Sequence, residues 1–330
     1  MDNLDLLEDI LFLNILSGSR SGNRELFQSR EQFEFYSTGL NILNSKNADL
    51  FIKSIRISYE EFRILLNLIT EFLEKSSHRK PIDPEQRLFI TLFHLAQGCS
   101  VHSLSFLFRI RYETARSVVT ETSEVLWKVL GPLYVSPPNE EEWESISHQF
   151  LADNIPPFGI PDCICAIDGK HIRIKCPHRT GSQFYNYKKY HSIILLTTCD
   201  NKYSFTLVDV GAYGSQSDGG VFKNSSFGKK FINNELGIPR GSNLPITSEF
   251  FPFYLVGDAA FPLKENLLKP YARVTNPDKE TYNTQRISGA RIRIEIAFGK
   301  YSYTRYRKWV NFWVNRCGST PIFRKFKEYI

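Results

Sequence analysis

Hydrophobic positions in the N-terminal part of the chain recur at helical spacing. Ser58 and Glu61 have the spacing of a capping box that opens a helix. The apolar positions that follow it are Phe62, Leu65, Leu66, Ile69 and Phe72. A second helix is expected to begin at Asp83 and Pro84 and to end at Gly98.

The next segment has the order short helix, turn, longer helix, which is typical of a helix-turn-helix. Ser100 caps "VHSLSFLF", "RIR" forms the turn, and the longer helix runs from Tyr112 through "ETARSVVTETSEVLWKVL". If this unit reads DNA, the start of the longer helix would enter the major groove. The residues on its outer face are Arg111, Glu113, Thr114, Arg116 and Ser117. A three-helix scaffold without DNA contact is the alternative, and the acidic "ETSE" that follows favours it.

The pattern changes from helical to strand-like spacing near residue 150. We interpret "VSPPNEEEWESI" as a Pro-rich, acidic connection before that boundary. Three apolar strands then follow, in "CICAIDGKHIRI", "YHSIILLTTCD" and "YSFTLVDVGAYG". A short turn at residues 200–202 joins the second strand to the third, which predicts an antiparallel meander.

Helices and one more strand complete the C-terminal part. The segment "DGGVFKNSSFGKKFINNE" is helical in character, "FPFYLVGDAAF" is a buried strand, and "GARIRIEIAFGKY" is a periodic helix. This order predicts an α/β architecture with helices packed on a sheet. We therefore expect a flexible tail over residues 1–50, a helical domain over 51–150 and an α/β domain over 151–330.

The composition and the charge distribution of the chain indicate which class of partner it binds. The chain has 330 residues, and its 42% apolar content is sufficient for packed cores. The formal charge of +6 is concentrated: residues 169–198 contain six Lys or Arg and no acid, and residues 300–330 contain eight against one. Such patches favour a polyanion such as DNA, with an ordinary solvated surface as the alternative.

The six cysteines contain no CxxC pair, so they are interpreted as core thiols of a reducing compartment. A zinc site at Cys163, Cys165, Cys176 and His178 stays open, although CxC within a strand lacks the usual knuckle turn. The N-terminus has no basic region of a signal peptide, and no apolar run approaches the roughly 20 residues of a membrane span. We expect an intracellular, soluble protein without membrane contact.

Four acidic residues occur in segments where a charge is expected to be costly. Asp168 lies in the first strand, Asp218 in "GSQSDGG", Asp258 at the end of "YLVGD", and Glu295 in the apolar helix. Singly, these residues could be a helix cap, a turn residue or a partner of Arg291. Together they suit Mg²⁺ or Mn²⁺ and the cleavage of phosphodiesters by two metal ions. This requires the first strand to lie beside the strand that precedes Asp258, with the helix of Glu295 packed on the sheet.

Other chemistries have less support. The chain contains no G-x-S-x-G elbow, no P-loop and no dinucleotide-binding fingerprint. His171 follows Asp168 by three residues and so is expected on the opposite face of the strand, as a surface or phosphate-contact residue in place of a metal ligand.

The quoted segments also resemble a known family. The blocks "AIDGKHIRIKCP", "GSQFYNYKKYHSIILLTTCD", "VDVGAYGSQSDGGVF", "VGDAAFPL" with "KPY", and "GARIRIEIAFG" are similar, in this order, to the DDE domain of Harbinger-type (PIF/Harbinger) transposases and the nuclease domesticated from them. The resemblance covers about residues 83–299. It implies an RNase H-like mixed sheet with flanking helices, preceded by a small all-α helix-turn-helix-like domain. It also implies Asp168, Asp258 and Glu295 as the catalytic triad, and Asp218 as a fourth metal-site carboxylate.

The resemblance further implies DNA with terminal inverted repeats as substrate, a homo-oligomer, and a Myb/SANT-like accessory protein that supplies DNA binding and import. We therefore expect a nuclear protein that reaches the nucleus from the cytoplasm with its partner. The chain departs from the family at Ala259, where relatives have "GDEAFPL", and in a shorter ending after "AFG". These departures leave a truncated or decayed copy open.

The preferred hypothesis is a metal-dependent DNA endonuclease or transposase. Its predicted DNA-binding residues are Lys170, His171, Arg173, Lys188, Lys189 and Arg116. A domesticated, non-catalytic DNA-binding or adaptor protein is the main alternative. A metal-dependent phosphatase or other hydrolase would require a compact pocket in place of an open basic groove.

Overall fold

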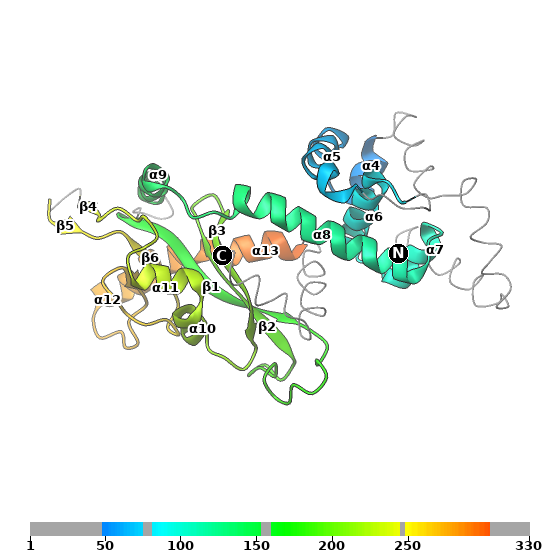
Figure 1. Ribbon diagram of the computed structural model, residues 1–330. Helices are drawn as coiled ribbons and strands as arrows, with labels where there is room; N and C mark the ends of the chain where they lie inside the picture. The colour runs from blue at the N-terminus through cyan, green and yellow to red at the C-terminus, as the bar shows by residue number, and fades with distance from the viewer. Residues whose placement is uncertain (1–47, 75–80, 153–159, 245–247, 304–330) are drawn as a thin grey trace. The chain divides into compact units, whose positions relative to one another are not determined.

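The computed structural model describes residues 48–74, 81–152, 160–244 and 248–303 (Figure 1). The chain divides into two compact units, and the division falls between Val129 and Leu130, inside helix α8. The tail predicted for residues 1–50 and the basic segment 300–330 lie almost entirely outside the described residues. The domain limits near residues 50 and 150 stay a prediction.

The first unit consists of helices whose caps follow the predicted pattern. The helices are α4 (Ala48–Ile55), α5 (Tyr59–Leu73), α6 (Pro84–Gln97), α7 (Val101–Leu107) and α8 (Tyr112–Tyr134). Ser58 and Glu61 form the capping box of α5. Asp83 caps α6, which ends at Gly98 in the left-handed conformation, with φ of 66°. The sequence therefore predicted these helix limits from local hydrogen bonding alone.

Aromatic side chains fill the core of this unit. Phe51, Phe62, Phe89 and Phe108 are buried, and their ring centroids form contacts of 5.7–6.4 Å. The order α6, α7, α8 contains the predicted short helix, turn and longer helix, while its contact with DNA stays a prediction. Ser117, predicted to face DNA, donates a hydrogen bond to Glu121 one turn further along α8.

The acidic segment before the second unit's sheet is a helix, so its interpretation as a connection was wrong. Helix α9 (Glu140–Ala152) begins with a capping box in which Asn139 and Glu142 bond reciprocally. Trp143, Ile146 and Phe150 are buried at helical spacing, and α9 packs against strand β1. The three consecutive glutamates obscured this spacing, because they lie in the solvated first turn, where the helix dipole favours negative charge.

A mixed sheet forms the centre of the second unit, with the strand order β3-β2-β1-β6-β7 among the described residues. Its strands are β1 (Cys163–Arg173), β2 (Ser192–Cys199), β3 (Phe205–Tyr213), β6 (Tyr254–Val256) and β7 (Leu267–Leu268). Strands β1, β2 and β3 form the predicted antiparallel meander. Strand β6 pairs with β1 in parallel, so the predicted neighbour relation is confirmed.

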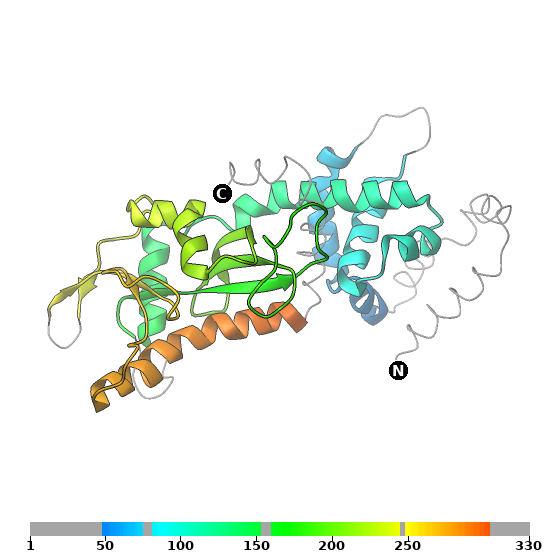
Figure 2. The same cartoon turned by 90° about the horizontal axis from the view of Figure 1, so that it is seen from below.

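Helices cover both faces of this sheet (Figure 2). The helical segments are α10 (Asp218–Asn224), α11 (Ser226–Ile232), α12 (Pro277–Thr281), the π-helix η1 (Tyr282–Ile287) and α13 (Ser288–Tyr303). Helix α13 runs along the face opposite α10 and α11 and buries Ile294, Ala297 and Phe298 against Ala166 and Cys199. Strands β4 (Ser242–Asn243) and β5 (Phe250–Phe251) form a separate hairpin. The predicted α/β class is therefore confirmed.

The described helices include none that is both long enough and apolar enough to cross a bilayer.

Candidate metal centre

Three aspartates from three different parts of the chain meet near the middle of β1. Asp168 lies within β1, Asp218 is the first residue of α10, and Asp258 follows β6 by two residues. Each offers a carboxylate oxygen, and these oxygens all lie within 4.8 Å of one another. Ala166 of β1 pairs with Val256 of β6 in parallel register. Asp168 and Asp258 each follow one member of this pair by two residues, so they occupy equivalent positions after it.

Two glycines allow this close approach. A Cβ atom on Gly169 would overlap the carboxylate of Asp218, and a Cβ atom on Gly219 would overlap the carbonyl oxygen of Ala260. The backbone N–H of Ala260 in turn donates to Asp258 Oδ1 at 2.8 Å. Each Asp-Gly pair thus supplies a carboxylate and the space beside it. The glycines are functional positions that the sequence analysis missed, although the repeated Asp-Gly dipeptide was a signal for them.

The electrostatics of the cluster oppose full ionisation. Burial raises the pKa of Asp218 to about 6, and the charges of Asp168 and Asp258 add to this increase, while Lys188 acts in the opposite direction. Burial also raises the pKa of Asp168. The N–H of Gly169, which donates to Asp168 Oδ1 at 2.8 Å, and the charge of Arg291 limit that increase. The three carboxylates are therefore incompletely compensated by the protein.

Glu295 lies outside this group of three, and the expectation that it occupies a costly buried position was wrong. Its side chain is 58% exposed and pairs with Arg291 at 3.5 Å, one turn earlier in α13. Helix α13 directs Ile294 and Ala297 into the sheet, which leaves Glu295 on the exposed side. Its charge still contributes to the raised pKa of Asp168, so the two carboxylates interact.

The donor set fits a divalent cation of the magnesium type. Carboxylate oxygens are the ligands that Mg²⁺ and Mn²⁺ prefer, and three of them converge here without an equal number of cationic partners. A bound cation would favour the ionised form of all three side chains and remove their mutual repulsion. The residues present could therefore hold such an ion.

The predicted phosphate-binding residues lie on β1 and in the loop that joins it to β2, except for Arg116. Lys170 places its Nζ 5.6 Å from the centre of the Phe298 ring, and the Arg173 guanidinium lies 4.4 Å from that of Tyr190. Lys188 faces the metal centre closely enough to lower the pKa of Asp218. Arg116 belongs to the first unit, where it pairs with Glu113 at 4.0 Å.

His171 and Lys189 do not join the carboxylate group. The Nδ1 atom of His171 lies 2.9 Å from the hydroxyl of Ser192, and burial lowers the pKa of His171, as does the charge of Lys188. Lys189 is exposed and adopts a left-handed conformation with φ of 63°. The role of His171 as a surface or phosphate-contact residue stays a prediction.

The alternative zinc site is not formed in the described part of the chain. Cys163, Cys165, Cys176 and His178 do not come together as a ligand group there. Burial raises the pKa of the Cys165 thiol to about 12, which disfavours the thiolate that zinc requires. Cys99, Cys163, Cys165 and Cys199 are buried, as predicted for core thiols, whereas Cys176 is exposed, so that prediction was wrong for Cys176.

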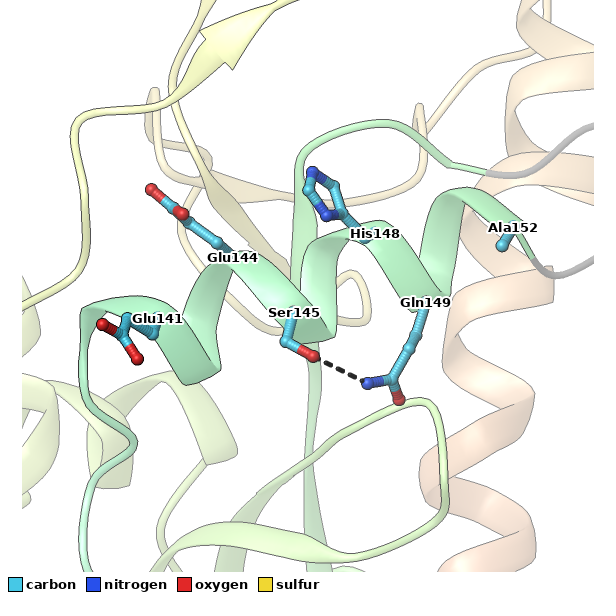
Figure 3. A pocket seen from close by; sticks show the side chains of 6 residues that line it. All are labelled: Glu141, Glu144, Ser145, His148, Gln149 and Ala152. Carbon is cyan, nitrogen blue, oxygen red and sulfur yellow. Dashed lines mark hydrogen bonds between the residues drawn. The ribbon is translucent and has the colours of Figure 1, made fainter.

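A shallow hollow of about 450 Å³ lies on the exposed side of α9 (Figure 3). Its lining residues are Glu141, Glu144, Ser145, His148, Gln149 and Ala152. All six belong to one helix, and Ser145 accepts a hydrogen bond of 3.2 Å from Gln149. None of the three clustered aspartates lines this hollow, so it is separate from the candidate metal centre.

Comparison with known proteins finds a family that is similar to the part of the chain that contains this site. Residues 167–308 match the family described as DDE superfamily endonuclease, and the match contains all four predicted acids. These residues are similar to a DDE superfamily endonuclease domain. The domain implies an RNase H-like fold for the mixed sheet, in agreement with the prediction.

Curated relatives confirm the resemblance to Harbinger-derived proteins. "Putative nuclease HARBI1" of Rattus norvegicus is 26% identical over 220 residues, covering 66% of this chain and 58% of the relative. "Protein ALP1-like" of Arabidopsis thaliana is 25% identical over 265 residues, covering 78% of this chain and 63% of the relative. The chain thus spans about three fifths of the length of these relatives. Comparison with solved structures gives no significant match.

Proposed function

We propose that this chain is a metal-dependent DNA endonuclease or transposase that uses a two-metal DDE mechanism. The observation that carries the proposal is the convergence of Asp168, Asp218 and Asp258 within 4.8 Å. Two further features support it: the DDE endonuclease domain, and the basic loop whose Lys188 faces the carboxylates. A phosphodiester backbone needs this combination of an acidic metal centre and nearby cations.

In this proposal each acid has a separate role. The charges of Asp258 and Glu295 both contribute to the raised pKa of Asp168. Asp168 would therefore bridge two ions, and Asp258 and Glu295 would each hold one of them. Asp218 would supply a fourth carboxylate to the same centre. Bound Mg²⁺ or Mn²⁺ would lower the pKa of the attacking water and neutralise the charge that develops on the phosphate.

The chain's own residues would position the DNA strand for in-line attack. Water oxygen forms a bond to phosphorus, the bond from phosphorus to the 3′ oxygen breaks, and a 3′-hydroxyl and a 5′-phosphate result. Lys170, Arg173, Lys188 and Lys189 would hold phosphates beside the carboxylates. For a transposase, the released 3′-hydroxyl then attacks a target phosphodiester, which exchanges one bond for another.

The wider biological context belongs to the same proposal. The substrate would be a duplex with terminal inverted repeats, held by a homo-oligomer because two DNA ends must be cut together. A Myb/SANT-like partner would deliver the protein to the nucleus and, with the helical unit and Arg116, contribute DNA binding.

The test is cleavage of a duplex that carries the ends of the protein's own element, in Mg²⁺ or Mn²⁺. Asp168→Ala should lose at least about a thousandfold in cleavage rate, equivalent to about 4 kcal/mol of transition-state stabilisation. Glu144→Ala, which removes an exposed carboxylate from α9, is the matched control and should cut normally. Equal cutting by Asp168→Ala and the unmodified chain would refute the enzymatic role. No cutting by either, in any metal, would favour the non-catalytic adaptor.

A further inference from the structure

An exposed tyrosine lies in the tight turn between Tyr185 and His191, which directly precedes β2 in the connection from β1. Tyr187 is 78% exposed, and its ring contacts His171 of β1 edge-on, with 5.5 Å between the ring centroids. Lys188 places its Nζ 5.4 Å from the centre of the same ring. A large aromatic side chain so exposed leaves much of its apolar surface in water, which favours a ligand that covers it.

The turn that carries Tyr187 is firmly anchored. Asn186 is 3% exposed; its N–H donates to the carbonyl of Tyr190 at 2.9 Å, and its Oδ1 accepts from the N–H of Tyr190 at 3.2 Å. Its Nδ2 donates to the buried hydroxyl of Ser192 at 2.8 Å, and the same hydroxyl lies 2.9 Å from His171 Nδ1. The turn is thus tied to both strands, and Tyr187 is presented at little further cost in conformational entropy.

The same turn borders the candidate metal centre. The ring contact of Tyr187 with His171 holds the turn against β1, three residues further along that strand than Asp168. Tyr187, Lys188 and the metal centre therefore lie in one neighbourhood of the second unit. A DNA strand whose phosphate is at the carboxylates would pass beside this tyrosine.

We propose that Tyr187 stacks on an unpaired base of the DNA strand that occupies the metal centre, while Lys188 contacts a neighbouring phosphate. This inference rests on the proposed function and assigns it a preferred substrate form. Bases inside a duplex are covered by their neighbours, so a protein ring can stack only on a base that is unpaired or displaced. Aromatic rings beside cations are the usual way in which proteins hold such strands.

Binding without metal tests the inference separately from cleavage. The full chain is titrated in EDTA with two probes, a perfect duplex and the same duplex with unpaired bases on one strand, the latter carrying 2-aminopurine at an unpaired position. The unmodified chain should prefer the second probe and quench its fluorescence. Tyr187→Ala should lower the affinity for this probe about tenfold and abolish the quenching, since stacking on an aromatic contributes about that much per base.

Three further variants sharpen the assignment. Tyr187→Phe should retain both the preference and the quenching, because the ring is kept. Tyr134→Ala, which removes a tyrosine that is 72% exposed on α8, should behave as the unmodified chain. Lys188→Gln should lower the affinity for both probes equally. It should also reduce the salt dependence of the affinity by about one released counterion.

Two results would overturn the inference: equal affinity of the unmodified chain for the two probes, or unchanged quenching in Tyr187→Ala. Equal affinity would point to a protein partner for this tyrosine. Either result leaves the proposed function intact if the chain still cuts duplex DNA. Quenching by a chain that never cuts would instead uphold the stacking role and refute the catalytic one.

Discussion

The two units each contain a cluster of charged side chains, and the clusters differ in how they are compensated. In the helical unit, Arg87 is 5% exposed and donates to Glu121 at 2.6 Å, and Ser117 donates to the same carboxylate. In the second unit, three carboxylates meet, and the charges of Asp168 and Asp258 add to the raised pKa of Asp218. The first cluster is balanced by its own side chains, as structural ion pairs are, whereas the second has the donor set that an added divalent cation would balance.

Breaking the balanced cluster should have the largest effect on folding. Arg87→Met removes the guanidinium that donates to Glu121, and the free energy of unfolding should fall by about 3 kcal/mol because a partly buried, charge-assisted hydrogen bond is lost. Urea denaturation followed by circular dichroism measures this change. The double variant Arg87→Met with Glu121→Leu should recover most of the loss, and both variants should keep their response to metal. A loss of the metal response in either variant would contradict the division of roles.

Filling the space at Gly169 should damage the second cluster without breaking the sheet. In Gly169→Ala, the added methyl group displaces the carboxylate of Asp218, and metal-dependent cleavage should fall about a hundredfold, or about 2.7 kcal/mol. Gly289→Ala is the matched control, because nothing lies within 4 Å of the added atom and its helix should be slightly stabilised. Normal cleavage by Gly169→Ala, measured beside this control, would show that the position of Asp218 is unimportant.

A smaller effect is expected on the stability of the metal-free protein. Asp218→Asn removes one like charge and should stabilise the metal-free chain by about 1 kcal/mol at pH 8, after allowance for solvent screening. The raised pKa of about 6 means that the folded state binds the proton more tightly than the unfolded state does. The cost of the ionised Asp218 is thus present above pH 6 and disappears as the pH falls toward 4.

The measurement is the difference in unfolding free energy between the unmodified chain and Asp218→Asn, from pH 8 to pH 4 in EDTA. This difference should become smaller as the pH falls through 6. A difference that grows as the pH falls, or one that favours the unmodified chain at pH 8, would show that Asp218 is already compensated.

Sequence patterns predicted much of this architecture, because strand pairing and helix caps depend on local signals. The apolar strands and the short turn at residues 200–202 were sufficient for the meander. The neighbour relation of β1 and β6 followed from the need to join Asp168 to Asp258, whereas the parallel direction of their pairing was not predicted. Helix α9 was missed, since its buried face consists of only three apolar positions among glutamates. The exposure of Glu295 could not be predicted, because the apolar residues around it leave the rotation of α13 on the sheet undetermined.

The spatial clustering of Asp168, Asp218 and Asp258 was harder to predict than the three candidate residues themselves. Asp218 belongs to the group only because α10 approaches β1 at Gly169, a contact between residues 49 positions apart that no local pattern contains. The anchoring of Tyr187 through Asn186, Ser192 and His171 likewise depends on tertiary contacts. Such sites require the fold before their chemistry can be assigned.

Titration of the metal-free chain with Mn²⁺, followed by calorimetry and by thermal unfolding, tests the central claim most directly. The account predicts saturable binding and a stabilisation of about 2.7 kcal/mol when the ion is present at a hundred times its dissociation constant. Asp168→Asn should lose both effects while keeping its fold. Equal binding by Asp168→Asn, or no binding by the unmodified chain, would contradict the assignment of Asp168, Asp218 and Asp258 as a metal centre.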